Sequence, residues 1–177
     1  MEENIEEQLR ARNLKKAFEG IVDCFSERLY WHIRRMVHVH EDADDILQET
    51  FVKIWKNLEK FRGDSKLYTW LYRIATNEAL SHLRSRKNLY LVGDNPAPDE
   101  YTFQSGDIYF DGEAASARLA LAIAHLPEKQ RVVFNLKYFE EMKYEEMSEV
   151  LETSVGALKA SYHHAVNKVK DYLDQTD

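Results

Sequence analysis

Apolar residues recur at intervals of three and four along most of the chain, which is the spacing of amphipathic helices. No stretch alternates apolar and polar residues as a half-buried strand would. Before residue 88 the pattern predicts four helices, with breaks near Gly20, between Val39 and Asp42, and at Gly63. The four helices predicted after residue 113 cover about 114–125, 128–139, 143–151 and 155–173. We therefore expect an all-α fold.

The stretch 42–61 has one apolar face and one polar face. Its apolar residues at helical spacing are Ile46, Leu47, Phe51, Ile54, Trp55 and Leu58. The outer face keeps Asp45, Gln48, Glu49 and Lys53. Asp42 is predicted to cap the helix, because an aspartate oxygen can accept hydrogen bonds from the free N–H groups of a first turn. Asp44 and Asp45 then lie near the positive end of the helix dipole, which favours carboxylates.

The stretch 61–86 interleaves aromatic residues with arginines and small polar residues. At helical spacing, one stripe consists of Trp70, Arg73, Asn77, Ser81 and Arg84, and a neighbouring apolar stripe of Leu67, Leu71, Ile74 and Ala75. Bases stack on aromatic rings, phosphates attract cations, and an amide can pair with a base edge. The segment by itself fits two interpretations equally: a site for single-stranded nucleic acid, or an ordinary amphipathic helix with solvated arginines.

Charge and composition divide the chain of 177 residues into three parts. The net charge is −7, and the segment 88–113 alone carries six acidic residues and no basic one. It also holds three of the six glycines and two of the three prolines, which is typical of a linker. We expect small helical domains at 1–87 and 114–177, joined by this flexible acidic linker. Strong DNA binding by the chain alone is disfavoured, since it needs many uncompensated phosphate contacts.

The C-terminal stretch 144–173 has the spacing of a helix-turn-helix, with a tight break at residues 152–154. Ser154 is a good cap for the second helix, whereas Glu152 stands where many such motifs place glycine. In this motif the second helix enters the major groove. Its candidate DNA contacts are Lys159, Ala160, Ser161, His163, His164 and Lys168. The alternative is a helical hairpin that only packs.

Other site classes find little support in the sequence. Adjacent histidines such as His163 and His164 point about 100° apart on a helix, so they cannot share one ion, and no calcium loop or metal signature occurs. Phosphate loops and nucleophile elbows are absent too. Cys24 is expected to be a small buried residue. We expect no metal, no cofactor and no enzymatic activity. Without a signal peptide or a long apolar run, a cytoplasmic protein with no membrane insertion is expected.

Three motifs occur in a characteristic order: DADDILQETFVKIW, FRGDSKLYTWLYRIATN, and LPEKQRVVFNLKYFEEMKYEEMSEVL followed by VGALK. Together they resemble the extracytoplasmic-function group of bacterial RNA polymerase sigma factors, in the sigma-70 family. The resemblance implies a transcription initiation factor whose N-terminal domain binds core polymerase and the minus-ten promoter element. Its C-terminal domain binds the polymerase flap and the minus-thirty-five element. It further implies an acidic linker in the polymerase's nucleic-acid channels and an anti-sigma factor as a partner.

The resemblance also assigns residues. The polymerase-binding residues are Asp45, Gln48, Glu49 and Phe51. The loop from Phe61 to Tyr68 matches the loop that captures a flipped base, and the minus-ten residues are Arg62, Asp64, Ser65, Tyr68, Trp70, Arg73, Asn77 and Arg84. Besides Glu152 in the turn, two departures stand out: the family usually has arginines where this chain has Ser161, His164 and Val166, and an aspartate where it has Ser81. The alternative function is a stand-alone helix-turn-helix regulator that binds duplex DNA, and a third is a structural helical adaptor.

Overall fold

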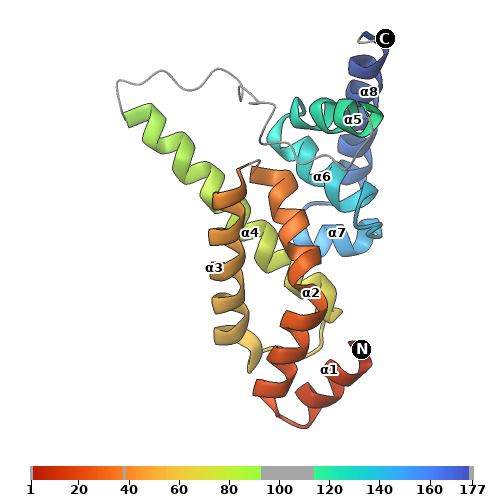
Figure 1. The fold of residues 1–177 in the computed structure, drawn as a ribbon. Helices are drawn as coiled ribbons and strands as arrows, with labels where there is room; N and C mark the ends of the chain where they lie inside the picture. Colours follow the sequence, from red (N-terminus) through yellow and green to blue (C-terminus); the bar gives the residue numbers. More distant parts are fainter. Residues whose placement is uncertain (1, 38, 93–113, 176–177) are drawn as a thin grey trace. The chain divides into compact units, whose positions relative to one another are not determined.

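The structure, a computed structural model, describes residues 2–37, 39–92 and 114–175. These residues form eight α-helices, as the sequence predicted: α1 (Glu2–Arg10), α2 (Leu14–Val37), α3 (His40–Leu58), α4 (Leu67–Val92), α5 (Ala114–Ala124), α6 (Glu128–Tyr138), α7 (Tyr144–Leu151) and α8 (Val155–Gln175) (Figure 1). They divide into two compact units, Met1–Leu83 and Arg84–Asp177, each of which is considered by itself.

The N-terminal unit is built on α2, which packs against α1 on one side and α3 on another. The buried residues of α2 recur at helical spacing: Ala17, Ile21, Phe25, Leu29, Ile33 and Met36. From the other helices, Ile46, Ile54, Leu58, Leu67, Leu71, Tyr72, Ala75 and Ala79 are buried as well. One apolar stripe per helix therefore suffices to close this core.

The break between the first two helices does not lie at Gly20. Gly20 is inside α2, and a Cβ added there would come within 2.9 Å of Ile5 Cγ1. The glycine thus lets α1 approach α2 closely, which is a packing role rather than a turn. The chain reverses instead at residues 11–13, where Arg12 has a φ of 56°.

Helix α3 begins at His40, three residues earlier than a cap at Asp42 would require. Val39 occupies the N-cap position, with φ −95° and ψ 130°, and Asp42 lies in the first turn. Its carboxylate is 3.4 Å from Nε2 of His82 on α4. The predicted cap is therefore wrong: Asp42 favours the helix through its charge near the positive end of the dipole, and it also faces α4.

A buried polar pair links α2 to α4 inside the N-terminal core. Nε2 of His32 and Oγ1 of Thr76 share a hydrogen bond of 2.9 Å, and both residues have no exposed surface. The imidazole ring also meets the ring of Tyr72 edge-on, with centroids 5.0 Å apart. Burial, reinforced by the charge of Arg35, lowers the pKa of His32 to about 3, so this histidine is neutral in the folded protein.

The C-terminal unit packs α5, α6 and α7 against the long helix α8 (Figure 1). Its central cluster comprises Ala122, Ile123, Leu126, Phe134, Ala165 and Val169, surrounded by partly buried aromatic rings such as Tyr162. Nη2 of Arg118 donates a hydrogen bond of 3.0 Å to the carbonyl oxygen of Leu173, which holds the end of α8 to α5. The core thus holds α8 from Tyr162 to Leu173.

The turn between α7 and α8 has the predicted helix-turn-helix chemistry. Glu152 adopts a left-handed conformation, with φ 51° and ψ 41°. A glycine would adopt this conformation without the steric cost of a Cβ. The Ser154 hydroxyl accepts a hydrogen bond of 3.3 Å from the backbone N–H of Ala157, which confirms the predicted cap. The turn therefore contains one strained residue and one good cap.

The predicted linker lies largely outside the described residues. Helix α4 continues to Val92, five residues beyond the expected end of the first domain at residue 87. The rest of the segment, positions 93–113, is outside the described residues.

Candidate nucleic-acid interface

The outer face of α3 carries the polar residues predicted to bind a partner protein. Asp45, Gln48 and Glu49 are all exposed. Phe51 is only partly exposed, because its ring meets that of Phe18 on α2 edge-on, with centroids 6.2 Å apart. Three of the four predicted residues are therefore available for contact, and Phe51 also belongs to the packing between α2 and α3.

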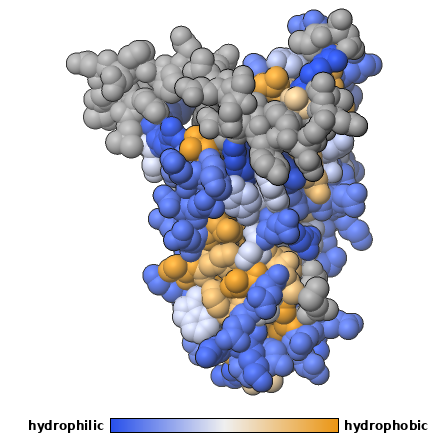
Figure 2. Space-filling view, viewed as in Figure 1, coloured by the Kyte–Doolittle hydropathy of each residue, from blue (hydrophilic) through white to orange (hydrophobic). Residues whose placement is uncertain are grey.

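The same face has an apolar part that sequence reasoning missed. Val52 is 50% exposed and Trp55 is 49% exposed. Trp55 was predicted to belong to the buried stripe, which is wrong: its ring packs on Phe18 at 5.2 Å and leaves half of its surface open. Figure 2 shows hydrophobic side chains at the surface of the N-terminal unit, where α2 and α3 lie side by side. Helical spacing could have placed Val52 on this outer face, because it follows Gln48 by one helical turn.

The connection between α3 and α4 forms an exposed loop at residues 59–66. Gly63 has a φ of 77°, a conformation that other residues rarely adopt, so a glycine is required for this turn. Arg62 and Asp64 beside it are exposed, and Ser65 is partly exposed. The loop thus presents a cation, an anion and a hydroxyl on a backbone whose shape Gly63 determines.

Trp70 is not on the exposed stripe where the sequence placed it. Only 9% of its surface is exposed, and the centre of its ring lies 5.1 Å from that of Phe61 in the loop. The indole therefore supports the loop from beneath. Tyr68 is partly exposed and packs edge-on against Tyr72, with centroids 5.7 Å apart. Of the two predicted minus-ten aromatic residues, Tyr68 therefore has a more accessible ring than Trp70.

The remaining residues of the predicted α4 stripe do lie at the surface. Asn77, Ser81 and Arg84 are exposed, and Arg73 is partly exposed. Together with Arg62 they give the loop and the outer face of α4 two kinds of group that bind nucleic acid: guanidinium groups for phosphates and an amide for a base edge.

The predicted DNA-reading helix exposes most of its candidates. On α8, Lys159, Ala160, His163, His164 and Lys168 are exposed, while Ser161 is partly buried. Nζ of Lys159 lies 5.6 Å from the ring centre of Tyr144, the first residue of α7, and Nζ of Lys137 lies 4.9 Å from the same ring. Cation–π contacts of this kind place positive charge beside the helix-turn-helix.

Comparison with known proteins decides what these surfaces belong to. A family model for sigma-70 region 2 matches residues 21–89, and one for sigma-70 region 4 matches residues 116–169. The ECF RNA polymerase sigma factor SigW of Bacillus subtilis is 35% identical, over 93% of this chain and 95% of its own length. The chain belongs to the extracytoplasmic-function sigma factors of the sigma-70 family. This sigma factor accordingly binds RNA polymerase, serves promoter-specific transcription initiation and is a non-catalytic subunit.

Further relatives agree with this assignment. RNA polymerase sigma-H factor of Pseudomonas aeruginosa is 34% identical, over 87% of this chain and 84% of its own length. The sigma factor RpoE of Bartonella quintana, solved with the anti-sigma factor NepR, has the same fold, with a TM-score of 0.74 over 90% of this chain and 98% of that one, at 22% identity. CnrH, solved with the cytosolic domain of CnrY, matches with a TM-score of 0.71 over 96% and 97%, at 26% identity.

The region 2 match covers most of α2, all of α3 and most of α4, and the region 4 match covers α6, α7 and most of α5 and α8. The two predicted domains, with the helix-turn-helix in the second, are thereby confirmed. Within the described parts of the chain, no helix of this sigma factor is long and apolar enough to cross a membrane.

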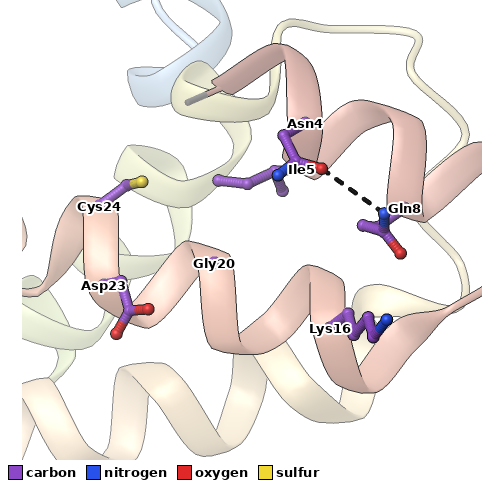
Figure 3. Close-up of a pocket in the computed structure, with 7 residues that line it drawn as sticks. All are labelled: Asn4, Ile5, Gln8, Lys16, Gly20, Asp23 and Cys24. Atoms are coloured by element: carbon purple, nitrogen blue, oxygen red, sulfur yellow. Dashed lines mark hydrogen bonds between the residues drawn. The ribbon is translucent and has the colours of Figure 1, made fainter.

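One pocket of the sigma factor contains none of the predicted site residues. It has a volume of about 340 Å³ between α1 and α2, where Gln8 donates a hydrogen bond of 3.5 Å to Asn4 (Figure 3). It is lined by Asn4, Ile5, Gln8, Lys16, Gly20, Asp23 and Cys24. Cys24 is partly exposed, which corrects the expectation of a buried residue. The candidate interfaces are open surfaces, as suits macromolecular partners.

Proposed function

We propose that three surfaces of this sigma factor divide promoter recognition among them. The outer face of α3 docks on core polymerase, the loop at residues 59–66 with α4 captures melted bases of the minus-ten element, and α8 reads the duplex minus-thirty-five element. This assigns docking and minus-ten binding to residues 1–87 and minus-thirty-five binding to residues 114–177, with the acidic segment 88–113 between them. The observation that carries the proposal is the exposure of three chemically different faces on separate helices.

The α3 face suits a protein partner. It combines Asp45, Gln48 and Glu49 with the half-exposed apolar side chains of Val52 and Trp55. Protein interfaces have an apolar centre with a polar rim, and tryptophan is enriched among the residues that contribute most to affinity. A nucleic acid would be repelled by the two carboxylates. We therefore assign this face to polymerase.

The loop and the outer face of α4 suit melted DNA. Extruding a base from the stack costs a few kcal/mol, and stacking and hydrogen bonds in a pocket must offset that cost. Tyr68 provides an accessible ring, Asp64 and Ser65 provide hydrogen-bonding groups, and Arg62 and Arg73 provide charge for phosphates. Trp70 contributes by supporting Phe61 and the loop from beneath.

A net charge of −7 supports action together with polymerase rather than alone. The segment 114–177 has eight basic and ten acidic residues, so α8 lacks the excess of cations that strong autonomous DNA binding requires. We also propose that the protein acts in the cytoplasm. An anti-sigma factor is expected to cover these surfaces in the absence of a signal, as NepR is bound to RpoE of Bartonella quintana.

The direct test is a pull-down with core RNA polymerase, followed by run-off transcription from selected promoters. Binding and promoter-dependent transcripts support the proposal, and loss of binding in Glu49→Ala supports the docking face. Tight promoter binding in a gel shift without polymerase would favour the stand-alone regulator instead. A chain that neither binds polymerase nor supports transcription would contradict the proposal.

Substitutions on the two DNA-binding surfaces are expected to have different effects on promoter recognition. Asn77→Ala should relax discrimination at one minus-ten base, because an amide reads a base edge. Lys159→Ala should weaken binding to all promoters alike and reduce the salt dependence by a slope of about one, if the ammonium contacts one phosphate. Two variants that alter only the stability of the protein would show that these surfaces are assigned wrongly.

A further inference from the structure

One stripe of α8 points directly away from the core of the C-terminal unit. Leu158, Ala165 and Val169 define the buried side of the helix. At 100° per residue, the residues opposite to them are Gly156, Ala160, His163 and Asn167, and all four are exposed. If α8 enters a major groove, this stripe is the part of the helix that faces the floor of the groove.

The first two turns of this stripe carry almost no side chain. Gly156 has none, Ala160 has a methyl group, and Ala157 beside them has another. Small residues let the helix backbone approach the base pairs closely. Consequently, longer polar side chains further along the same stripe can reach the base edges, and those are His163 and Asn167.

These two side chains are joined to each other one helical turn apart. Nδ2 of Asn167 donates a hydrogen bond of 3.1 Å to Nε2 of His163. The bond uses one N–H of the amide and leaves its carbonyl oxygen and its second N–H available. An acceptor and a donor side by side on an asparagine are the pair that matches N6–H and N7 of adenine in the major groove.

We propose that Asn167, held in position by His163, is a specificity-determining residue that reads one adenine in the promoter element bound by α8. His163 acts as a positioning residue, because its hydrogen bond restrains the rotamer of Asn167 before DNA arrives and so reduces the ordering cost of binding. The inference rests on the proposed function of α8. It adds the base that this helix reads and a residue that sequence reasoning did not single out.

The test is in vitro transcription with core polymerase and the full-length chain, on a promoter library randomised over the upstream duplex element. Asn167→Ala should lower the preference for adenine at a single position by about five- to a hundredfold, as expected for one bidentate contact. Gln175→Ala is the matched control, because it removes an exposed amide near the end of the same helix. It should select the same sequences as the parent protein.

His163→Ala should lower the preference at the same position, by about two- to fivefold, since one hydrogen bond is lost. His163→Gln should restore part of it, because a glutamine oxygen can accept the bond from Asn167. In a background of Asn167→Ala, the change at His163 should no longer affect that position. An effect of His163→Ala that persists in that background would exclude a positioning role.

Two further outcomes separate this inference from the function on which it rests. A parent protein that shows no preference within the upstream element would contradict the proposed role of α8 itself. Two results would overturn only the inference, provided that the parent protein has a clear preference. If Asn167→Ala leaves that preference unchanged, Asn167 makes no contact with the DNA. If Asn167→Ala weakens transcription equally for every sequence, Asn167 contacts the DNA backbone rather than a base.

Discussion

Nζ of Lys53 donates a hydrogen bond of 2.5 Å to Oε1 of Glu78, and this contact joins α3 to α4. The side chain of Glu78 is only 11% exposed, whereas that of Lys53 is 51% exposed. Glu78 is adjacent in sequence to Asn77, and Lys53 follows Glu49 by one turn. The helix proposed to dock on polymerase and the helix proposed to meet melted DNA are therefore linked by an ion pair whose acidic member is nearly buried.

Lys53→Ala is expected to lower the free energy of unfolding of the N-terminal unit by about 1 kcal/mol, because it leaves the Glu78 carboxylate without this partner. The loss is no larger because the Lys53 side chain is half exposed and its charge is screened by water. Urea unfolding followed by tryptophan fluorescence measures it selectively, since Trp31, Trp55 and Trp70 all lie in this unit. Lys56→Ala, at an exposed position on the same helix, should change little. Equal effects of the two variants would contradict the role of the pair.

Stability of the N-terminal unit should fall in mild acid because of His32. Burial lowers its pKa to about 3 in the folded protein, against 6.5 in the unfolded chain. Below pH 6.5 the unfolded chain therefore binds a proton that the folded protein excludes. The contribution of His32 to the free energy of unfolding is fully present above that pH and declines as the pH falls to about 3. Between pH 7 and pH 5 the expected loss is about 2 kcal/mol.

His32→Gln separates this contribution from that of other titrating groups. Its amide can still bond to Thr76 but takes up no proton, so unfolding curves at several pH values should show a flatter dependence between pH 6.5 and 5. Some stability is lost at pH 7 as well, because the ring contact with Tyr72 is removed. A slope equal to that of the parent protein would mean that His32 does not exclude the proton.

Two substitutions at Trp70 distinguish packing from base stacking. Trp70→Ala should cost about 3 kcal/mol of stability, as expected for truncating a buried aromatic side chain that supports Phe61. Trp70→Phe keeps a ring in contact with the loop and should retain most of both stability and transcription. If Trp70→Phe folds normally but loses minus-ten discrimination, the indole contacts the base directly.

Trp55→Ala should weaken binding to core polymerase by about tenfold or more, the effect typical of a central aromatic contact. Its effect on folding should be smaller than that of Trp70→Ala, because half of the ring is already exposed. A competition assay against the parent protein measures the affinity. Glu27→Ala, exposed on α2, is the control and should compete normally. Unchanged affinity of Trp55→Ala would remove the apolar part of the face from the interface.

Glu152→Gly should stabilise the C-terminal unit by about 1 kcal/mol, because Glu152 has a φ of 51° and glycine adopts that conformation without strain. Glu149→Gly removes the same charge from the interior of α7 and should destabilise by a similar amount. Thermal unfolding monitored by tyrosine absorbance or near-ultraviolet circular dichroism compares the two. Changes of the same sign would show that charge, rather than backbone conformation, governs the result.

Much of the fold and of the site could be predicted from the sequence. Apolar spacing predicted the number of described helices, although it put the break between the first two in the wrong place, and the Ser154 cap and the constrained turn at Glu152 followed from local chemistry. The exposed candidates Asp45, Gln48, Glu49 and Asn77 were also found, because a helix's polar face is readable from its period. These features depend on neighbours within a few residues along the chain.

Other features depended on contacts between helices, which the sequence by itself does not specify. Gly20 suggested a break, but it allows Ile5 to approach α2. Trp70 suggested a stacking surface, but Phe61 covers it. Trp55 suggested a core residue, but α2 shields only one side of its ring.

The sequence alone therefore determined the helices, the helix-turn-helix and the sigma-factor motifs, since local periodicity and residue type carry that information. Only the tertiary structure decided which aromatic residues support the loop and which are exposed to a partner. Side-chain packing between helices distant in sequence determines exposure, and the physical reason is that the same amphipathic pattern is satisfied by several ways of packing one helix on another.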